Sequence, residues 1–393
     1  MNSRESTKAH GFQSQAILHL GNMQTAGPAG KGKNQVMEIM NNSAQSSWLS
    51  QLQVRPTGPS NGLNASIRQN SSCDRTLLTR LLQNLRENRF ALRAMLAAFR
   101  ALQGVGITVI PNHFYWPIPD LRELESRDWT SNPSPPGLDL NLDKQLELAR
   151  EVVPRYQMEC SFPDHAESST GYHYNNGFFE TVDAEVAYTL VRHFKPSRII
   201  EVGGGSSTRV LATALRANRA SGQSGELLTI EPFPNRSLEG ITNLIAARVQ
   251  DVDLDLFLSL GDGDILFLDS SHVVSVGSDV VREYLEILPR LHKGVLIHVH
   301  DIFLPSDYPR DAVLSKLCFW SEQYLLQAFL AFNPQFEVLW GSSAMQQFHP
   351  DVLLATFPQW DHSYSRIAKE VRQFLPTSDG DRVWPSSFWM RRI

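Results

Sequence analysis

Short apolar runs alternate with helical stretches in the part of the chain that follows Tyr172, and this alternation restricts the possible folds more than any other feature. The first run, Arg198 to Val202 (RIIEV), follows a helical pattern over Val182 to Phe194. A glycine-rich turn and a second helical stretch to about Ala220 come after it. Strands that alternate with helices form a mostly parallel sheet covered on both faces. The sequence therefore predicts a doubly wound, Rossmann-like α/β fold.

Six further runs have the composition of strands. Five of them are separated by helical or turn-rich intervals and span residues 227–231, 247–252, 265–269, 295–299 and 336–340. The last run, at 387–391 (SFWMR), is expected to add an edge strand, as a mixed sheet allows.

The N-terminal part has a different character. Residues 1–72 are rich in Ser, Asn, Gln and Gly and carry too little apolar material to offset the entropy of ordering, which predicts a disordered tail. From 75 to 102, apolar residues recur at three- and four-residue steps beside six arginines and one glutamate, which predicts an amphipathic helix. The arginines permit binding to a membrane surface or a nucleic acid, although a solvated face on a docking helix is favoured.

Three parts are expected along the chain. Proline-rich residues 111–141 predict an extended connector, and helical spacing returns over 143–153. The predicted division is a tail of residues 1–72, a helical and extended N-terminal region of residues 73–170 that packs on the core, and an α/β domain of residues 171–393.

Composition and charge exclude several classes of protein. The 393 residues include 36 Lys and Arg and 41 Asp and Glu, a formal charge of −5, which argues against a nucleic-acid-binding protein. The three cysteines lie far apart and form no CxxC pair, so neither a disulfide framework nor a thiolate zinc site is indicated. The chain has no apolar run of membrane-spanning length and no signal-peptide pattern. A cytoplasmic protein without a membrane span or a nucleic-acid partner is predicted, and a homo-oligomer is left open.

Acidic residues and histidines close the predicted strands, although Asp and Glu are poor strand residues and costly to bury. In an open α/β sheet, ligands bind outside the carboxyl ends of the strands, so this edge is where chemistry is expected. The residues concerned are Glu201, Glu231, Asp251, Asp269 with His272, and His300 with Asp301.

The first strand leads into the turn EVGGGSST, which contains Gly203, Gly204 and Gly205. These glycines allow a ligand to approach the backbone closely, and Ser206 is placed to cap the next helix. A nicotinamide dinucleotide is disfavoured because its fingerprint needs glycine where this chain has Thr208. Glu201 would repel a pyrophosphate and attract a cation, so a sulfonium or amine ligand is expected, unless the glycines serve only strand-to-helix packing.

Two further acids are candidates for holding a nucleoside. Glu231 closes the second predicted strand and is placed to accept both hydroxyls of a ribose. The alternative is an ordinary acidic strand end, since Pro232 ends the ladder. Asp251 is expected either to contact an adenine amino group or to begin a helix together with Asp253 and Asp255.

The fourth and fifth strand ends have the residues of a catalytic site. ILFLDSSH places His272 three residues after Asp269, and VLIHVHD ends in His300 and Asp301. If those strands are neighbours, the two aspartates meet at one mouth, where they suit Mg²⁺ and His272 suits a general base, with His300 as the second choice. The alternative is a metal-free site in which an aspartate orients a histidine. His298 shares the strand face of His300 and is alternatively a core residue.

Together the motifs EVGGGSST, IEPFP, QDV, LFLDSSH and HVHDIF resemble the class I S-adenosylmethionine-dependent methyltransferases, specifically the bacterial group called methyltransferase family 24. YNNGFF ahead of the first strand and WSEQYLLQAFLAF after the fifth resemble the same group. The likeness spans about residues 111–393, and the order and spacing of the motifs make it fairly specific.

This resemblance implies a seven-stranded sheet and S-adenosylmethionine (SAM) as the cofactor. The methionine part would lie against Glu201, Gly203, Gly204, Gly205 and Ser206. Glu231 would hold the ribose, Asp251 would hold the adenine end, and Asp269 would lie close to the cofactor.

The motif DSSH followed by HD is similar to metal-dependent sugar and catechol O-methyltransferases. By that analogy Asp269 and Asp301 are candidate Mg²⁺ ligands and His272 is the candidate base. Two departures from this pattern argue against the metal. His300 stands where some relatives have a further acidic ligand, and Asp301 is followed by Ile302 instead of Asn.

The predicted function is therefore methyl transfer from SAM to a hydroxyl, or an amine, of a small molecule such as a sugar or natural product, most simply as an O-methyltransferase. One alternative is an NAD-dependent oxidoreductase, against which Thr208 and the missing Tyr-x-x-x-Lys pair count. Another is a non-catalytic scaffold that uses the basic helix of residues 75–102. The row of strand-end carboxylates argues against a scaffold, because burying carboxylates is costly and a sheet without a catalytic function does not need them.

Overall fold

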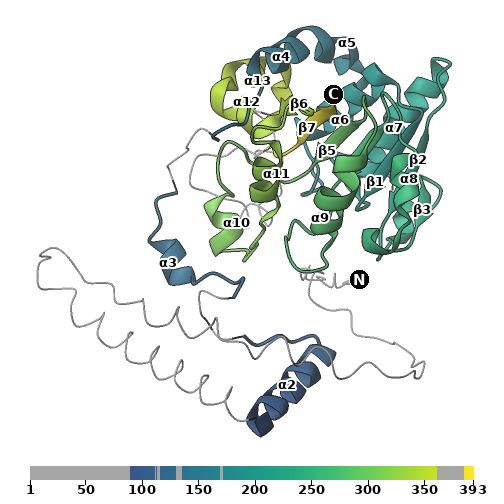
Figure 1. Cartoon of the computed structure of the whole chain (residues 1–393). Helices are drawn as coiled ribbons and strands as arrows, with labels where there is room; N and C mark the ends of the chain where they lie inside the picture. Colours follow the sequence, from purple (N-terminus) through teal and green to yellow (C-terminus); the bar gives the residue numbers. More distant parts are fainter. Residues whose placement is uncertain (1–88, 111, 113–115, 130–134, 169–170, 361–384) are drawn as a thin grey trace, which may run out of the picture. The chain divides into compact units, whose positions relative to one another are not determined.

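The computed structural model describes residues 89–110, 112, 116–129, 135–168, 171–360 and 385–393 (Figure 1). The described residues up to Trp116 and those from Pro117 onward belong to two separate units, and each is described by itself. The predicted tail of residues 1–72 lies outside the described residues. Across the described ranges, none of the helices combines the length and the apolar character that a membrane crossing requires.

The first unit contains helix α2 (Arg89–Gly104), whose sequence is RFALRAMLAAFRALQG. Leu, Ala and Arg favour the helical backbone, and the chain turns out of the helix at Gly106, which has a φ of +80°. The helix predicted over 75–102 is thus confirmed from Arg89 onward, and residues 75–88 lie outside the described part.

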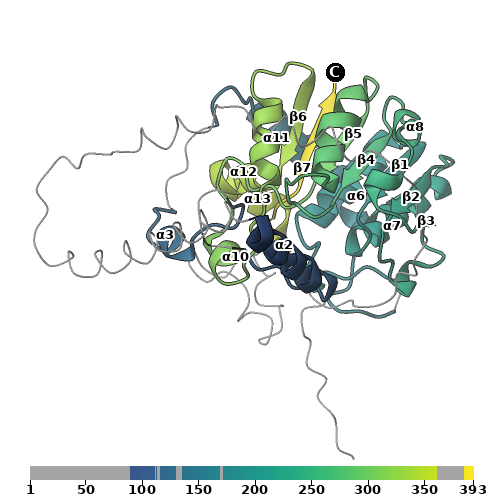
Figure 2. The ribbon, with the colours of Figure 1, turned by 60° about the horizontal axis from the view of Figure 1, so that its bottom comes forward.

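The second unit contains a seven-stranded sheet with the order β3-β2-β1-β4-β5-β7-β6 (Figures 1 and 2). Its strands are β1 (Arg198–Val202), β2 (Glu226–Ile230), β3 (Asn243–Ile245), β4 (Ile265–Leu268), β5 (Leu296–Val299), β6 (Phe336–Gly341) and β7 (Phe388–Arg392). The pairs among β1 to β5 are parallel, and β7 runs antiparallel to both of its neighbours. The predicted mostly parallel, seven-stranded sheet is confirmed.

The C-terminal run forms a strand, but the prediction that it lies at the edge is wrong. Figure 2 shows β7 between β5 and β6, and Trp389 pairs with His298 on one side and Trp340 on the other. Phe388, Trp389 and Met390 are all fully buried. Three successive buried residues require cover on both faces, which an interior strand of a layered sheet receives.

Helices cover both faces of the sheet because successive strand residues point to opposite sides. On one face Ile199 and Phe267 pack in a core with α6 (Asp183–Phe194) and α7 (Ser206–Ala220). On the other face Ile200 and Leu268 pack with α8 (Leu254–Leu258), α9 (Asp279–Arg282) and α11 (Glu322–Leu330). The result is a three-layer arrangement in which both faces of each central strand are buried.

Shorter helices complete the second unit. They are α3 (Leu121–Glu125), α4 (Leu142–Glu147), α5 (Val153–Tyr156), α10 (Arg310–Leu314), α12 (Ser342–Phe348) and α13 (Pro350–Thr356). A π-helical turn at Leu148–Val152 joins α4 to α5, which confirms the helix predicted over 143–153.

The strand predicted over 247–252 is absent, and that prediction is wrong. The third strand is β3, which ends at Ile245, and Val249–Asp251 form a 3₁₀ turn. Arg248 and Asp251 form an ion pair at 2.8 Å across this turn. Residues three apart point to opposite faces of a strand, so this pair requires a turn.

The connector of residues 111–141 is not extended throughout, which corrects a third prediction. Helix α3 begins after Asp120, whose side chain accepts a hydrogen bond from the amide of Arg122 at 3.1 Å. The prolines of this segment lie outside Leu121–Glu125, so they do not interrupt that single turn.

A buried glutamine ties the segment before the first strand to the sheet. Gln145 on α4 donates to the carbonyl of Leu140 at 2.6 Å and accepts from the amide of Gly341 at 2.8 Å. Ala149 and Val153 join the core on the α6 side of the sheet. A buried amide that satisfies backbone groups in two segments holds them in one geometry.

Candidate functional site

The carboxyl ends of the central strands lie in one row, joined by backbone hydrogen bonds. The amide of Gly203 donates to the last residue of β2 at 3.0 Å, and the amide of Asp269 donates to the last residue of β1 at 2.9 Å. The amide of His300 donates to the last residue of β4 at 3.0 Å. Glu231, which directly follows β2, belongs to the same edge of the sheet. The structure thus brings these four predicted site residues to one side of the fold.

The glycine turn after β1 is in contact with the ends of both neighbouring strands. Gly203 has a φ of +85°, and a Cβ there would lie 1.9 Å from the carbonyl oxygen of Asp269. The amide of Gly204 donates to Glu231 Oε2 at 3.1 Å. A Cβ on Gly205 would meet no atom within 4 Å, so the turn is open on that side. Close packing requires glycine at 203, and the open side is where a ligand can approach.

Glu201 lies beneath this turn, with no exposed surface. Its carboxyl oxygens accept hydrogen bonds from the hydroxyls of Ser207, Thr208 and Thr229, each at 2.8 Å. Burial raises its pKa to about 7, although the three hydroxyls act in the opposite direction. Glu201 therefore braces the turn from below.

Glu201 is expected to make the fold less stable as the pH rises. An acid with a folded pKa of about 7 and an ordinary unfolded pKa binds more protons when folded, so stability falls between about pH 4.5 and 7. Between pH 5 and 8 this group lowers the unfolding free energy of the wild type by about 2–3 kcal/mol, and we expect that decrease to be absent in Glu201→Gln. Urea unfolding across that range measures it, with the exposed Glu239→Gln as the matched control. Parallel pH profiles for wild type and Glu201→Gln would contradict the expectation.

Glu231 and Asp251 have different surroundings. Glu231 is partly buried, and besides Gly204 it accepts a hydrogen bond from the amide of Phe233 at 2.8 Å. Asp251 lies beyond β3, and its side chain is 52% exposed and paired with Arg248, whose hydrogen bonds lower its pKa. The structure therefore brings Glu231 to the glycine turn and leaves Asp251 out of the row of strand ends.

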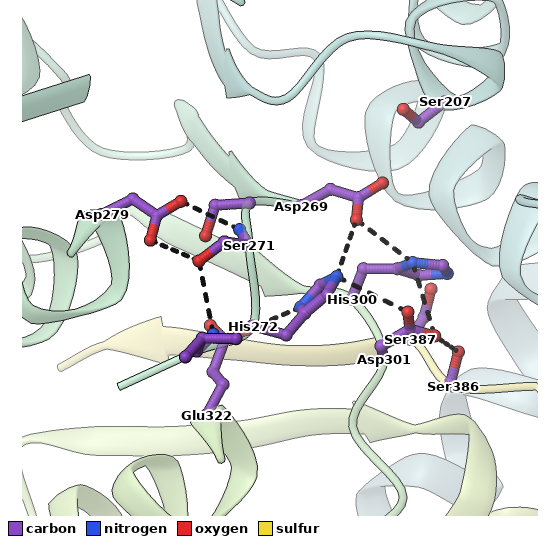
Figure 3. A network of polar contacts seen from close by, with 12 residues as sticks. Ser207, Asp269, Ser271, His272, Asp279, His300, Asp301, Glu322, Ser386 and Ser387 are labelled. Carbon is purple, nitrogen blue, oxygen red and sulfur yellow. Dashed lines mark hydrogen bonds and ion pairs between the residues drawn. The ribbon is translucent and has the colours of Figure 1, made fainter. Parts of the chain in front are cut away.

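Four carboxyl groups surround two imidazoles at the strand-end row, most of them visible in Figure 3. We call this group the acid–histidine cluster, and its members are Asp183, Asp269, His272, His300, Asp301 and Glu322. Asp269 Oδ1 lies 3.4 Å from His272 Nε2 and 3.4 Å from His300 Nδ1. Asp301 is 3.5 Å from the first ring and 3.8 Å from the second. Each histidine thus faces both aspartates.

A further buried carboxyl group stands behind each ring. Glu322 Oε2 lies 2.8 Å from His272 Nδ1, and Asp183 Oδ2 lies 3.8 Å from His300 Nε2. Glu322 and Asp183 are 1% and 4% exposed, whereas the side chains of the two aspartates between the rings are 28% and 22% exposed. The aspartate pair is therefore the part of the cluster that faces outward.

The surroundings determine the charge of the two rings. Burial alone would lower the pKa of His272 and His300, but the facing carboxylates outweigh it and raise the pKa of both well above the usual value. Burial would raise the pKa of Asp269, yet His300 and His272 hold it below its usual range. The two imidazolium groups stabilise the fold up to neutral pH, and this contribution is lost as the pH rises through their raised pKa. Because the cluster contains four carboxyl groups and only two imidazole rings, an additional positive charge beside it is favoured.

His298 belongs to the core, which confirms that alternative. It has no exposed surface, stacks on Phe267 with ring centroids 3.7 Å apart, and has Nε2 2.9 Å from the hydroxyl of Ser387. Burial, and the charge on His300, hold its pKa well below the usual value. His298 is therefore a neutral, stacked imidazole of the core.

Two members of the cluster, Glu322 and Asp183, were not predicted from the sequence. Both stand in the first turn of a helix, Glu322 in α11 and Asp183 in α6. Acidic residues are common there because they complement the helix dipole, so their position carries no special signal. For Glu322, the motif WSEQYLL was the one available hint.

The donor set does not fit Mg²⁺ in this arrangement. Among the described residues, no group of three or more His, Cys, Asp or Glu side chains has the arrangement of a metal site. Mg²⁺ prefers carboxylate and water oxygens, whereas the rings of His272 and His300 lie 3.4–3.8 Å from the oxygens of Asp269 and Asp301 and occupy the space around them. We assign no step to a metal.

A cavity of about 310 Å³ lies beside the glycine turn. Ser206, the first residue of α7, and Arg209 form one part of its wall, and Tyr172, His173 and Asn175 form another. The Arg209 guanidinium also donates to the carbonyl of Gly205 at 2.8 Å. Its positive charge, without a carboxylate in the wall, distinguishes this cavity from the acid–histidine cluster.

Comparisons with known proteins point to one family. Residues 200–302 match a family described as "Methyltransferase domain". A curated but uncharacterized protein of Archaeoglobus fulgidus is 34% identical over 176 residues, which cover 41% of this chain and 77% of that protein.

Two solved structures are more distant. One, from Plasmodium falciparum, is described as a protein-L-isoaspartate O-methyltransferase in complex with S-adenosyl-L-homocysteine. Its sequence is 13% identical, the match covers 40% of this chain and 82% of that chain, and the TM-score is 0.25. The other is a SAM-dependent methyltransferase from Anabaena variabilis, 12% identical over 68% of this chain and 100% of its own, with a TM-score of 0.26.

The family match begins inside β1 and ends just after Asp301, so it contains the glycine turn and both outward-facing aspartates. The seven-stranded sheet, the open glycine turn and the acidic strand ends are the features that the resemblance of the motifs implied. The chain belongs to the class I S-adenosylmethionine-dependent methyltransferases.

Proposed function

We propose that this chain transfers the methyl group of SAM to a hydroxyl, or an amine, of a small molecule such as a sugar or natural product. The observation that carries the proposal is the position of the glycine turn. It contacts Glu231 on one side and Asp269 on the other, next to a cluster in which carboxyl groups outnumber imidazoles. An electron-rich edge beside open backbone suits a cationic nucleoside better than a pyrophosphate.

The residues that would hold SAM follow from these positions. The methionine part would lie against Gly203, Gly204, Gly205 and Ser206, with the carboxyl group of Glu201 beneath the turn, and Glu231 would accept the ribose hydroxyls. Arg209 in the adjoining cavity would face the carboxylate of the methionine part. Asp251 remains a proposed contact of the adenine end, although its ion pair with Arg248 would have to open or shift for that contact.

When bound, SAM supplies an electrophilic methyl group that a nucleophilic oxygen or nitrogen can take. The chain's own residues have to hold the acceptor in line and to remove its proton. We propose His272 Nε2 as the base and His300 as the second candidate. Because the facing carboxylates raise the pKa of His272, the ring must first lose its proton to solvent before Nε2 can take the proton of the acceptor. An additional positive charge beside the carboxylates of Asp269 and Asp301 would lower the pKa of the His272 ring and so favour the loss of its proton.

Calorimetry with three ligands tests the proposal. We expect SAM and S-adenosylhomocysteine to bind the full chain, and NAD to show no heat of binding, because the acidic cluster disfavours a pyrophosphate and Thr208 stands where the dinucleotide fingerprint needs glycine. Binding to the native state would also raise the melting temperature. Failure of both adenosyl compounds to bind would refute the proposal, and binding of NAD alone would favour the oxidoreductase alternative.

Other predictions stand beside this proposal. The acceptor is expected to be a small molecule, with no nucleic acid as partner and a cytoplasmic location. The division into a tail of residues 1–72, a region of residues 73–170 and a methyltransferase domain of residues 171–393 also stays a prediction.

A further inference from the structure

Glu322 contacts the ring of His272 from the side away from the aspartates (Figure 3). Its Oε2 lies 2.8 Å from Nδ1, and the side chain is 1% exposed. Among the described residues, Oε1 has no hydrogen-bond partner. The contact with His272 is thus what compensates the burial of this carboxyl group.

The residues around Glu322 hold His272 at the backbone as well. The amides of Ser321 and Glu322 donate to the carbonyl of His272 at 2.9 and 3.1 Å, and the Ser321 hydroxyl accepts from the amide of Val274 at 2.8 Å. The Trp320 ring packs edge-on against the imidazole, with centroids 5.1 Å apart. His272 has a φ of +61°, a conformation that a non-glycine residue keeps only where its surroundings impose it.

These contacts determine which ring nitrogen faces the outward side of the cluster. With Nδ1 held by Glu322, Nε2 lies 3.4 Å from Asp269 and 3.5 Å from Asp301. A ring turned by half a revolution would leave the buried Glu322 carboxyl group without that partner, which is costly. The orientation is therefore coupled to Glu322.

We infer that Glu322 is a positioning residue, which holds the His272 ring so that Nε2 points to the strand-end edge where methyl transfer is proposed. Its part in the reaction rests on the proposed function, whereas the orientation of the ring does not. This role accounts for the WSEQYLL segment, which the glycine turn and the strand-end acids leave unexplained.

The experiment compares the full-length wild type with Glu322→Gln and Glu322→Ala, each labelled with ¹⁵N-histidine. Long-range ¹H–¹⁵N spectra distinguish the two ring nitrogens, and a His272→Asn variant identifies the signals of this residue. In the wild type we expect a far-downfield Nδ1 proton, as for a donor to a carboxylate, and a shift of the Nε2 resonance when SAM is added.

The two variants separate orientation from stability. Glu322→Gln keeps an acceptor oxygen opposite Nδ1, so it should retain the SAM-induced shift of Nε2. Glu322→Ala should lose both the downfield proton and that shift. Calorimetry should show a dissociation constant for SAM within about threefold of wild type in both variants, because Glu322 does not line the glycine turn. The signals of His298, which is bound to Ser387, serve as the internal control and should not change.

Unchanged Nδ1 and Nε2 signals in Glu322→Ala, with an intact SAM-induced shift, would overturn the inference. If that variant does not fold, the wild-type spectrum decides, since a His272 without a downfield Nδ1 proton would also overturn it. A wild type that shows the Nδ1 proton but binds neither SAM nor S-adenosylhomocysteine would overturn the role in methyl transfer and leave the orientation of the ring confirmed.

Discussion

Gly203→Ala is expected to lower the free energy of unfolding by about 3 kcal/mol and to abolish the binding of SAM. Alanine disfavours the φ of +85° at this position, and its Cβ would lie 1.9 Å from the carbonyl oxygen of Asp269. That oxygen belongs to the backbone, so relief requires the end of β4 to move away from the turn. Urea unfolding measures the first effect, and calorimetry with SAM measures the second.

Gly205→Ala is the matched control for stability, because it adds the same methyl group two residues further along the same turn. Its Cβ would meet no atom within 4 Å, and its φ of −172° is extended backbone that alanine adopts. We expect a change in unfolding free energy of at most about 1 kcal/mol. Equal losses of stability in the two variants would show that the close approach at Gly203 does not constrain the turn.

Asp183→Ala is the second large effect, with an expected loss of about 3–5 kcal/mol of unfolding free energy. The Asp183 carboxyl group is buried and accepts from the hydroxyl of Ser342 at 2.7 Å, from the amide of Ser386 at 2.8 Å and from the amide of Ser387 at 3.0 Å. It joins the start of α6 to α12 and to the residues that lead into β7. Alanine leaves all three donors buried and unpaired.

Asp279→Ala provides the comparison for Asp183. Asp279 also accepts several hydrogen bonds, from the amide and hydroxyl of Ser271 at 2.9 and 2.6 Å, but it is only partly buried, so water can replace the lost partner. A loss of about 1 kcal/mol is expected, measured by urea unfolding of both variants. Comparable losses for the two aspartates would mean that burial does not determine the cost at Asp183.

The central strands could be predicted because their signal is local. Arg198 to Val202 (RIIEV) has three strongly apolar residues out of five, and it coincides with β1. The run at 247–252 has a similar apolar content, but the contact of Arg248 with Asp251 turns the chain there, and β3 is only three residues long. The spacing of the apolar residues does not reveal that two charged side chains three residues apart will form an ion pair.

The composition of the acid–histidine cluster could be predicted only in part. The adjacency of Asp269, His272 and Asp301 follows from the strand-end rule once β4 and β5 are neighbours. The raised pKa of His272 could not be predicted from the sequence, because Glu322, fifty residues away in the chain, reaches the same ring. A pKa depends on every charge within a few ångströms, whatever its distance along the chain.

The sequence by itself determined the α/β class, the glycine turn and the identity of the acids that end the strands, because hydrophobic period and strand-end position are properties of neighbouring residues. Only the tertiary structure decided that β7 is an interior strand, that Glu201 is buried beneath the turn, and that two buried carboxyl groups stand behind the histidines. Each of these depends on contacts between segments far apart in the chain, and such contacts follow from packing rather than from any local pattern of residues.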